Sequence, residues 1–399
     1  MLNRVLNKYL SLNYEVKILL LTSFISGVFD GLLYMGGLLQ LYLKSAGYSG
    51  GDVGFFMFIN GLVSTILIIP SGYLADVFGR RRIAIISIIP LTLSTFLIAT
   101  STLKPFMATS ALLGGLGSAL IHPSLSALLA DKARDNLEVT YSSASFLLSI
   151  GMAIGGLMGW IPEILASKGL TYLEAYRIVI FLSCIISLTT CIPLLLVSES
   201  KPYRTKLIKI HISKLLFKIL VLNVIVGLGA GFSIPLLSYY LSLKFKVESG
   251  PIGTLNAITS IIQSISFLIA PLMVELLRML YAIVIPQALA AILLAILPFT
   301  SNFIIASTIL IARTTFMNMV NPLWSSLLVR SCSKEERATI ISISTLLWSL
   351  PYSFTTQLGG IIMDYSLDTP IFITSIIYMI YVLLILTLLR RENLDPNTK

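Results

Sequence analysis

Twelve stretches of mostly apolar residues follow one another along the chain, and only short polar connections separate them. A transmembrane helix needs about twenty such residues. In lipid a spanning segment must satisfy its own backbone hydrogen bonds, so we expect helices. A membrane barrel would alternate polar and apolar residues, and these stretches do not. The predicted helices span residues 17–43, 53–75, 83–102, 105–130, 140–164, 175–197, 216–243, 252–277, 280–300, 302–329, 338–362 and 370–390.

Composition narrows the class of protein further. Of the 399 residues 56% are hydrophobic and only 12% are charged, whereas a soluble domain carries about 25% charged residues. A soluble globule of this size is therefore excluded, and the chain is predicted to be an all-α, multi-pass membrane protein. Its three cysteines are too few and too scattered for a disulfide framework or a zinc site. We expect no metal and no cofactor.

Basic residues predict the orientation in the membrane. Of the 28 lysines and arginines, 21 fall at the two termini and in the even-numbered connections, the side that the positive-inside rule assigns to the cytoplasm. Both termini are then cytoplasmic, in a plasma membrane. The same bias explains the net charge of +10 without any nucleic-acid partner.

The two halves of the chain repeat each other at an offset of 199 residues. This offset places "IHPSLSALLAD" (121–131) on "VNPLWSSLLVR" (320–330), Gly54 on Gly253 and Asp76 on Glu275. Six helices in each half give both repeats the same topology, related by a pseudo-twofold axis along the membrane normal. We expect one bundle over 1–197, a basic cytoplasmic linker over 198–215 and a second bundle over 216–399.

The connection after the second predicted helix, "GYLADVFGRR", is the most specific motif. Asp76 lies at the negative end of a helix dipole and needs a partner there. Gly72 would let another backbone approach closely, and Gly79 would permit a tight turn. Arg80 and Arg81 hold the loop on the cytoplasmic side. A loop that only set the topology would need the arginines alone.

Twelve helices, the six-plus-six repeat, the basic central loop and this motif together resemble the major facilitator superfamily. The resemblance implies that family's fold, and a cytoplasmic latch in which Asp76 meets the start of helix 11, near Ala338, in the outward-facing state. The second-half copy, "PLMVELLRM", keeps an acid in Glu275 and a base in Arg278 but has Pro271 in place of the first glycine. We therefore expect an asymmetric latch dominated by Asp76.

Two ionisable residues fall deep inside predicted helices, where a charge is costly and indicates function. Asp30 lies in helix 1 and Arg313 in helix 10, at similar depths. The resemblance places both beside the central cavity, because helices 1, 4, 7 and 10 line it in this fold. Asp30 is predicted to be a proton-coupling and substrate-binding residue, and Arg313 a substrate-binding residue. The alternative is a structural ion pair between the halves.

His122 precedes Pro123 in helix 4. It is a candidate proton relay, or else it satisfies the carbonyl that the proline leaves free. Further candidates for substrate contact lie on the cavity helices and are mostly aromatic, which suits an amphipathic or weakly charged organic solute better than a sugar. They are Tyr34, Phe232, Tyr239 and Asn318.

Helix 5 carries Gly151, Gly155 and Gly159 at a spacing that allows close helix packing. This stretch partly resembles the glycine motif of the superfamily's drug/H⁺ antiporters, although Gly156 stands where that motif has a proline. Helix 4 also lacks the early arginine that several branches carry. The glycines therefore favour an exporter only slightly.

The sequence thus predicts a secondary active transporter that moves a small organic solute by alternating access. Proton coupling and export of amphipathic, drug-like compounds are favoured. One alternative is proton-coupled uptake of an organic anion or nutrient, and another is a non-transporting sensor or scaffold with a carrier fold. No nucleophile–base pair is present, so the chain is not expected to be an enzyme. We expect a monomer.

Overall fold

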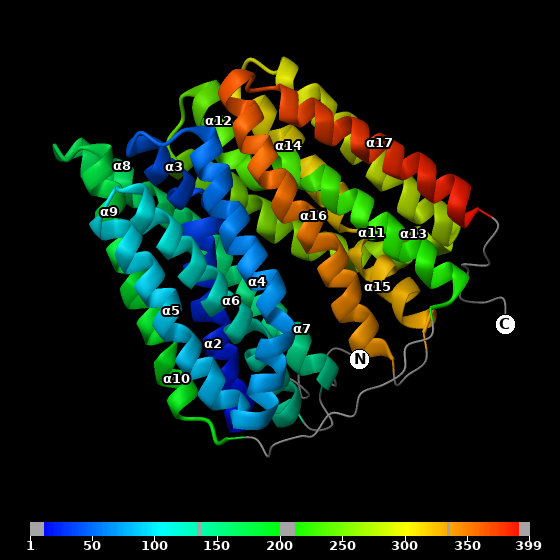
Figure 1. Ribbon diagram of the computed structural model, residues 1–399. Coiled ribbons are helices and arrows are strands. Elements are labelled where there is room, and N and C mark those ends of the chain that lie inside the picture. Colours follow the sequence, from blue (N-terminus) through cyan, green and yellow to red (C-terminus); the bar gives the residue numbers. More distant parts are fainter. Residues whose placement is uncertain (1–11, 134–136, 200–211, 333–335, 391–399) are drawn as a thin grey trace. The chain divides into compact units, whose positions relative to one another are not determined.

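The computed structural model describes residues 12–133, 137–199, 212–332 and 336–390, and within these ranges the chain forms helices and short connections with no strand (Figure 1). The first half contains α2 (Tyr14–Asp30), η1 (Gly31–Met35), α3 (Leu38–Ser45), α4 (Gly50–Phe78), α5 (Arg80–Thr100), α6 (Lys104–Ala133), α7 (Leu137–Leu157), η3 (Met158–Trp160), α8 (Ile161–Ser167), α9 (Tyr172–Thr189) and α10 (Cys191–Leu195). The second half contains α11 (Lys214–Ser233), η4 (Ile234–Leu236), α12 (Leu237–Phe245), α13 (Ser249–Ile296), η5 (Leu297–Phe299), α14 (Phe303–Asn318), α15 (Asn321–Arg330), α16 (Arg337–Tyr365) and α17 (Thr369–Leu389).

Every predicted span coincides with helical chain, which confirms the all-α membrane class. Ten helical stretches of the described residues are long and apolar enough to cross a bilayer. The other two predicted spans, 252–277 and 338–362, are helical in α13 and α16 but lie outside those ten. The count of twelve spans therefore stays a prediction.

Several spans consist of two helices because glycine or proline interrupts them. In the first span, Gly37 adopts φ +70° between η1 and α3. In the seventh, Pro235 lies in the short η4 turn between α11 and α12. The long α13 contains one residue with non-helical dihedral angles, Arg278, which divides it at the predicted junction between the eighth and ninth spans.

The chain divides into two compact units. Unit 1 comprises residues 1–47, 59–205 and 248–260, and unit 2 comprises residues 48–58, 206–247 and 261–399. The first turns of α4 thus belong to unit 2, and the first turns of α13 belong to unit 1. The predicted linker, 198–215, falls mostly on residues 200–211, which lie outside the described residues, and the predicted domain boundaries stay a prediction.

Unit 1 is held together by apolar packing and by close contacts between helices at glycines. Its core includes the buried side chains of Leu19 on α2, Ile88 on α5 and Leu128 on α6. A Cβ atom on Gly27 of α2 would lie 2.2 Å from the carbonyl oxygen of Leu148 on α7. On α7, a Cβ atom on Gly155 would likewise lie 2.2 Å from the carbonyl oxygen of Val28 on α2, which confirms the close packing predicted for the glycines of helix 5.

Unit 2 uses similar contacts around α11. A Cβ atom on Gly227 would lie 2.3 Å from the carbonyl oxygen of Trp348 on α16. On the other side of α11, the Ser233 hydroxyl donates a 2.7 Å hydrogen bond to Thr374 on α17. These contacts place α11 between α16 and α17 and fix the surroundings of Arg313, described below.

Candidate functional site

Unit 1 contains a cavity of about 270 Å³ between α2, α5, α6, α7 and α9. Two of its lining residues are charged or titratable near neutral pH, Asp30 and His122. Most of the remaining wall is apolar, but several hydroxyl groups interrupt it, and these come from Ser23, Ser26, Ser118, Ser126, Tyr141, Ser145, Ser187 and Thr190. Most of these hydroxyls carry no distinctive signal in the sequence, because serine and threonine are common on helix surfaces in membranes.

Asp30 lies at the end of α2, where the chain changes from α-helix to the five-residue π-helix η1. The next residue, Gly31, packs so tightly on α7 that a Cβ atom would lie 2.2 Å from the carbonyl oxygen of Met152. Such π-helical insertions are rare and occur frequently at functional sites. Here the local change in helical pitch lies directly beside the intramembrane carboxylate.

No described residue of unit 1 forms an ion pair or hydrogen bond with the Asp30 carboxylate. A charge held in a membrane span without a partner costs several kcal/mol. The group therefore needs a proton, water in the cavity or a bound cation. A proton or a cation held by Asp30 in this way can be bound and released again.

His122 lies one helix away on α6 and lines the same cavity. The structure thus brings together the two residues predicted to handle protons. Its imidazole forms no hydrogen bond with the described residues. Nearby, the Tyr141 hydroxyl donates a 2.8 Å hydrogen bond to the carbonyl oxygen of Ser126, which fixes one edge of the cavity.

The other predicted substrate contacts do not line this cavity. Tyr34, on η1, packs edge to face on Phe29 with ring centroids 6.4 Å apart. Phe232, Tyr239, Arg313 and Asn318 belong to unit 2. Asn318 there donates a 3.2 Å hydrogen bond to the Gln263 side chain. The approach of these four residues of unit 2 to Asp30 therefore stays a prediction.

Arg313 is almost completely buried, with 3% of its surface exposed. One of its terminal nitrogens donates a 3.1 Å hydrogen bond to the Tyr378 hydroxyl, and the guanidinium lies 5.5 Å from the centre of that ring. Its Nε has no partner among the described residues. A neutral tyrosine only partly compensates a buried guanidinium, so Arg313 retains the capacity to bind an anion.

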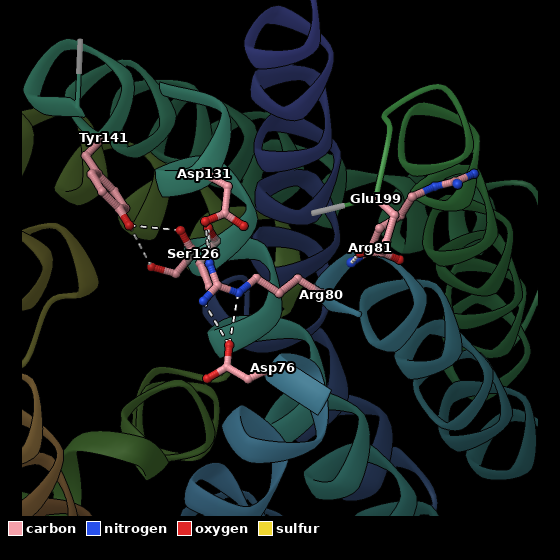
Figure 2. A network of polar contacts seen from close by, with 8 residues as sticks. Asp76, Arg80, Arg81, Ser126, Asp131, Tyr141 and Glu199 are labelled. Carbon is pink, nitrogen blue, oxygen red and sulfur yellow. Dashed lines mark hydrogen bonds and ion pairs between the residues drawn. The ribbon is translucent and has the colours of Figure 1, made fainter. Parts of the chain in front are cut away.

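A second polar constellation lies at the end of α4, where Figure 2 shows the Arg80 side chain pointing between two carboxylates. The Nε and one terminal nitrogen of Arg80 bind the same Asp76 oxygen, at 3.0 Å and 2.8 Å. Its other terminal nitrogen binds Asp131 on α6 and the Ala127 carbonyl oxygen. Arg80 is therefore the partner of Asp76, and it joins α4 to the end of α6.

Glu199 organises the other side of this connection (Figure 2). Its two carboxylate oxygens accept hydrogen bonds from the backbone N–H groups of Arg81 and Arg82, at 3.0 Å and 3.1 Å. An acid placed at a helix N-terminus satisfies unpaired donors and the helix dipole. The Arg81 side chain instead donates hydrogen bonds to the carbonyl oxygens of Leu194 and Leu195, at 2.9 Å each.

The two glycines of the motif behave differently. Gly79 alone separates α4 from α5 and adopts φ +105°, which confirms the predicted tight turn. A Cβ atom on Gly72 would meet no atom within 4 Å. The close backbone approach predicted at Gly72 therefore stays a prediction.

Within the part of the chain that the structure describes, the second-half copy carries no comparable network. Glu275 and Arg278 are both exposed. Neither forms an ion pair with any described residue. The pairing of Asp76 with the start of α16 joins the two units and stays a prediction.

Sequence reasoning missed Asp131 and Glu199. Both are acids near a predicted membrane boundary, where they read as solvent-exposed loop residues. A signal was available for Asp131, because the 199-residue offset aligns it with Arg330 and so reverses the charge between the halves. Residues with opposite charge at repeated positions indicate different partners in the two halves.

Comparison with known proteins agrees with this architecture. The sequence model of one family, described as Major Facilitator Superfamily, matches residues 19–356. Among curated relatives, the quinolone resistance protein NorA of Staphylococcus aureus is 23% identical over 256 residues, covering 62% of this chain and 63% of that protein. The match thus spans less than two thirds of that relative's length.

Solved transporter structures share the fold. A bacterial homologue of the human lysosomal transporter Spinster superposes with a TM-score of 0.75 and 14% identity, over 94% of this chain and 96% of the other. The xylose transporter XylE from E. coli superposes with a TM-score of 0.73 and 14% identity, over 93% and 95%. At such identities the likeness shows the fold alone.

Proposed function

Because the chain belongs to the major facilitator superfamily of membrane transporters, we propose that it is a proton-coupled carrier that exports amphipathic organic compounds by alternating access. The observation that carries the proposal is Asp30. Its carboxylate lines the cavity of unit 1, and no described residue of that unit pairs with it. A carboxylate in this position can exchange a proton for a cationic substrate.

The lining of the cavity indicates which class of substrate it would bind. Its wall is mainly apolar, with scattered hydroxyls and one acid, which suits a flat or flexible organic cation better than a sugar. The relative NorA is a quinolone resistance protein, which favours export of drug-like compounds. The fold likeness to a xylose transporter carries no weight for the substrate.

His122 has a supporting role in this proposal. It lines the same cavity as Asp30, on the neighbouring helix α6, and imidazole exchanges protons near neutral pH. While the cavity is open to the cytoplasm, the proton that Asp30 gives up to an incoming cation would leave past His122. The basic-residue bias supports a plasma-membrane orientation with the Arg80 network on the cytoplasmic face.

Uptake of an organic anion is the second candidate, and Arg313 favours it. A buried guanidinium with one tyrosine as partner and an unpaired Nε is suited to hold a carboxylate. The two candidates give different results for Arg313→Ala. Loss of substrate binding supports anion uptake, whereas intact binding with altered coupling supports export.

Transport in liposomes tests the leading proposal. With an acidic lumen, wild-type protein should accumulate ethidium, a fluorescent lipophilic cation, as protons leave. Asp30→Asn should bind ethidium without accumulating it. Glu174→Gln is the matched control, since the Glu174 carboxylate caps the start of its own helix α9 through Thr171 and is not part of the cavity wall. Accumulation by Asp30→Asn at the wild-type level would exclude Asp30 as the coupling site.

A further inference from the structure

The start of α4 lies at the opposite end of that helix from the Asp76 loop. The start of α13 likewise lies far along the helix from Arg278, where α13 is divided. In both helices, this first part is grouped with the other unit: residues 48–58 with unit 2 and residues 248–260 with unit 1. Each start is therefore held by chain from the other half of the sequence. The contacts that hold them are similar in the two units.

In unit 2 the start of α4 is held by a carboxylate from the end of α16. The backbone N–H groups of Gly50 and Gly51 donate hydrogen bonds to the two oxygens of Asp364, at 2.6 Å and 2.8 Å. One turn further on, a Cβ atom on Gly54 would lie 2.9 Å from the carbonyl oxygen of Thr356. The acid thus satisfies two unpaired helix donors where the two backbones approach most closely.

In unit 1 the start of α13 is held by a carboxylate from α8. The N–H group of Gly250 donates a 2.8 Å hydrogen bond to Glu163. The Trp160 indole donates a 2.9 Å hydrogen bond to the Thr254 hydroxyl. One turn along, a Cβ atom on Gly253 would lie 2.0 Å from the carbonyl oxygen of Gly156 on α7. Acid and close backbone approach therefore occur together here as well.

The glycines at the two helix starts are related by the internal repeat, but the two carboxylates that bind them are not. Gly250 and Gly253 lie 199 residues after Gly51 and Gly54, whereas Asp364 and Glu163 are 201 residues apart and the acids differ in length. Two different side chains reach the same kind of backbone donors at repeated positions. This pattern is expected if the contact between a carboxylate and a helix N-terminus has a function in each half.

We propose that Asp364 and Glu163 form a pair of carboxylate latches at this end of the carrier. Each holds a helix N-terminus from one half of the sequence on a helix from the other half, and both must release together when this end opens. The inference rests on the alternating-access mechanism proposed above. Release exposes the helix N–H groups to water, which replaces the carboxylate as their partner.

Hydrogen–deuterium exchange of the purified protein, without substrate or gradient, tests the latches. Asp364→Asn keeps the side-chain size but turns one of the two acceptors into a donor. Loss of a charge-assisted hydrogen bond should speed amide exchange in peptides covering 48–58 by about tenfold or more. Because the latches release together, exchange over 248–260 should also rise, and Glu163→Gln should produce the same pair of changes from unit 1.

Glu174→Gln is again the control, because it removes a carboxylate cap that lies within a single helix. Its effect should be confined to the start of α9. Unchanged exchange over 48–58 in Asp364→Asn would overturn the proposal, and so would acceleration of 48–58 with 248–260 unchanged. If Asp364→Asn fails to fold, Glu163→Gln carries the test alone. Since no transport is measured, failure of the latches and failure of proton-coupled export are distinguishable.

Discussion

The junction between α4 and α5 and its copy inside α13 both turn the chain at one residue with positive φ, but their surroundings differ. At the first, Gly79 turns the chain with φ +105° and ψ +130°. At the second, 199 residues later, Arg278 turns it with φ +64° and ψ +156°. Around Gly79 lie Asp76, Arg80 and Glu199 with their partners. Around Arg278 the described residues form no ion pair.

The repeated fold therefore needs the turn twice but the charge network only once. Glycine adopts this backbone conformation at little cost, whereas for other residues it costs of order 1–3 kcal/mol. The second half retains the turn with an arginine and tolerates that strain. Among the described residues, such a network of polar contacts surrounds only the first junction. The asymmetric latch itself stays a prediction.

The largest effect is expected where the network is densest. Arg80→Ala would leave the Asp76 and Asp131 carboxylates facing each other with no cation between them, in a region where all three side chains are less than one-third exposed. We expect a stability loss of about 2–3 kcal/mol and at least a tenfold loss of transport. Thermal unfolding in detergent and initial transport rates in liposomes measure these.

Arg82→Ala provides the control for that prediction. The Arg82 side chain is 75% exposed and lies 4.0 Å from Glu199, so its ion pair is weak. Equal losses in both variants would mean that the network has no special role and that the loop needs only positive charge.

At the two turn residues, substitutions should change the stability by smaller amounts and in opposite directions. Gly79→Ala should destabilise by about 1–3 kcal/mol, because alanine disfavours the positive φ and its Cβ would lie 2.7 Å from the Glu199 carboxylate. Arg278→Gly should stabilise the protein by about 1 kcal/mol by relieving strain. Melting temperatures of the two variants shifting in the same direction would contradict the comparison.

The smallest effect is expected at the acid of the second copy. Glu275→Gln removes an exposed carboxylate without an ion-pair partner among the described residues, so stability should change by less than about 0.5 kcal/mol. Transport should stay near the wild-type rate, whereas Asp76→Asn should slow it severely. A severe transport loss in Glu275→Gln would show that the latch is symmetric after all.

Much of the fold could be predicted from the length and spacing of the apolar stretches, because in a bilayer such a stretch satisfies its backbone hydrogen bonds by forming a helix. The break after Asp30 does not follow, because the π-helix depends on how Gly31 packs on α7. Asp30 and His122 could each be found from the cost of a polar group in a membrane. Glu199 could not, because its role comes from contact with an arginine 118 residues away along the chain. For Asp131 the internal repeat shows a charge reversal, but its partner Arg80, 51 residues away, is known only from the structure.

Proton release on substrate binding tests the central claim most directly. Ethidium is added to detergent-solubilised protein in weakly buffered solution, and the pH change is recorded with a dye for wild type and Asp30→Asn. If Asp30 exchanges a proton for a cation, wild type releases about one proton per ethidium bound and Asp30→Asn releases none while retaining measurable binding. Equal release by both proteins would contradict the account and place the exchanging proton on another group.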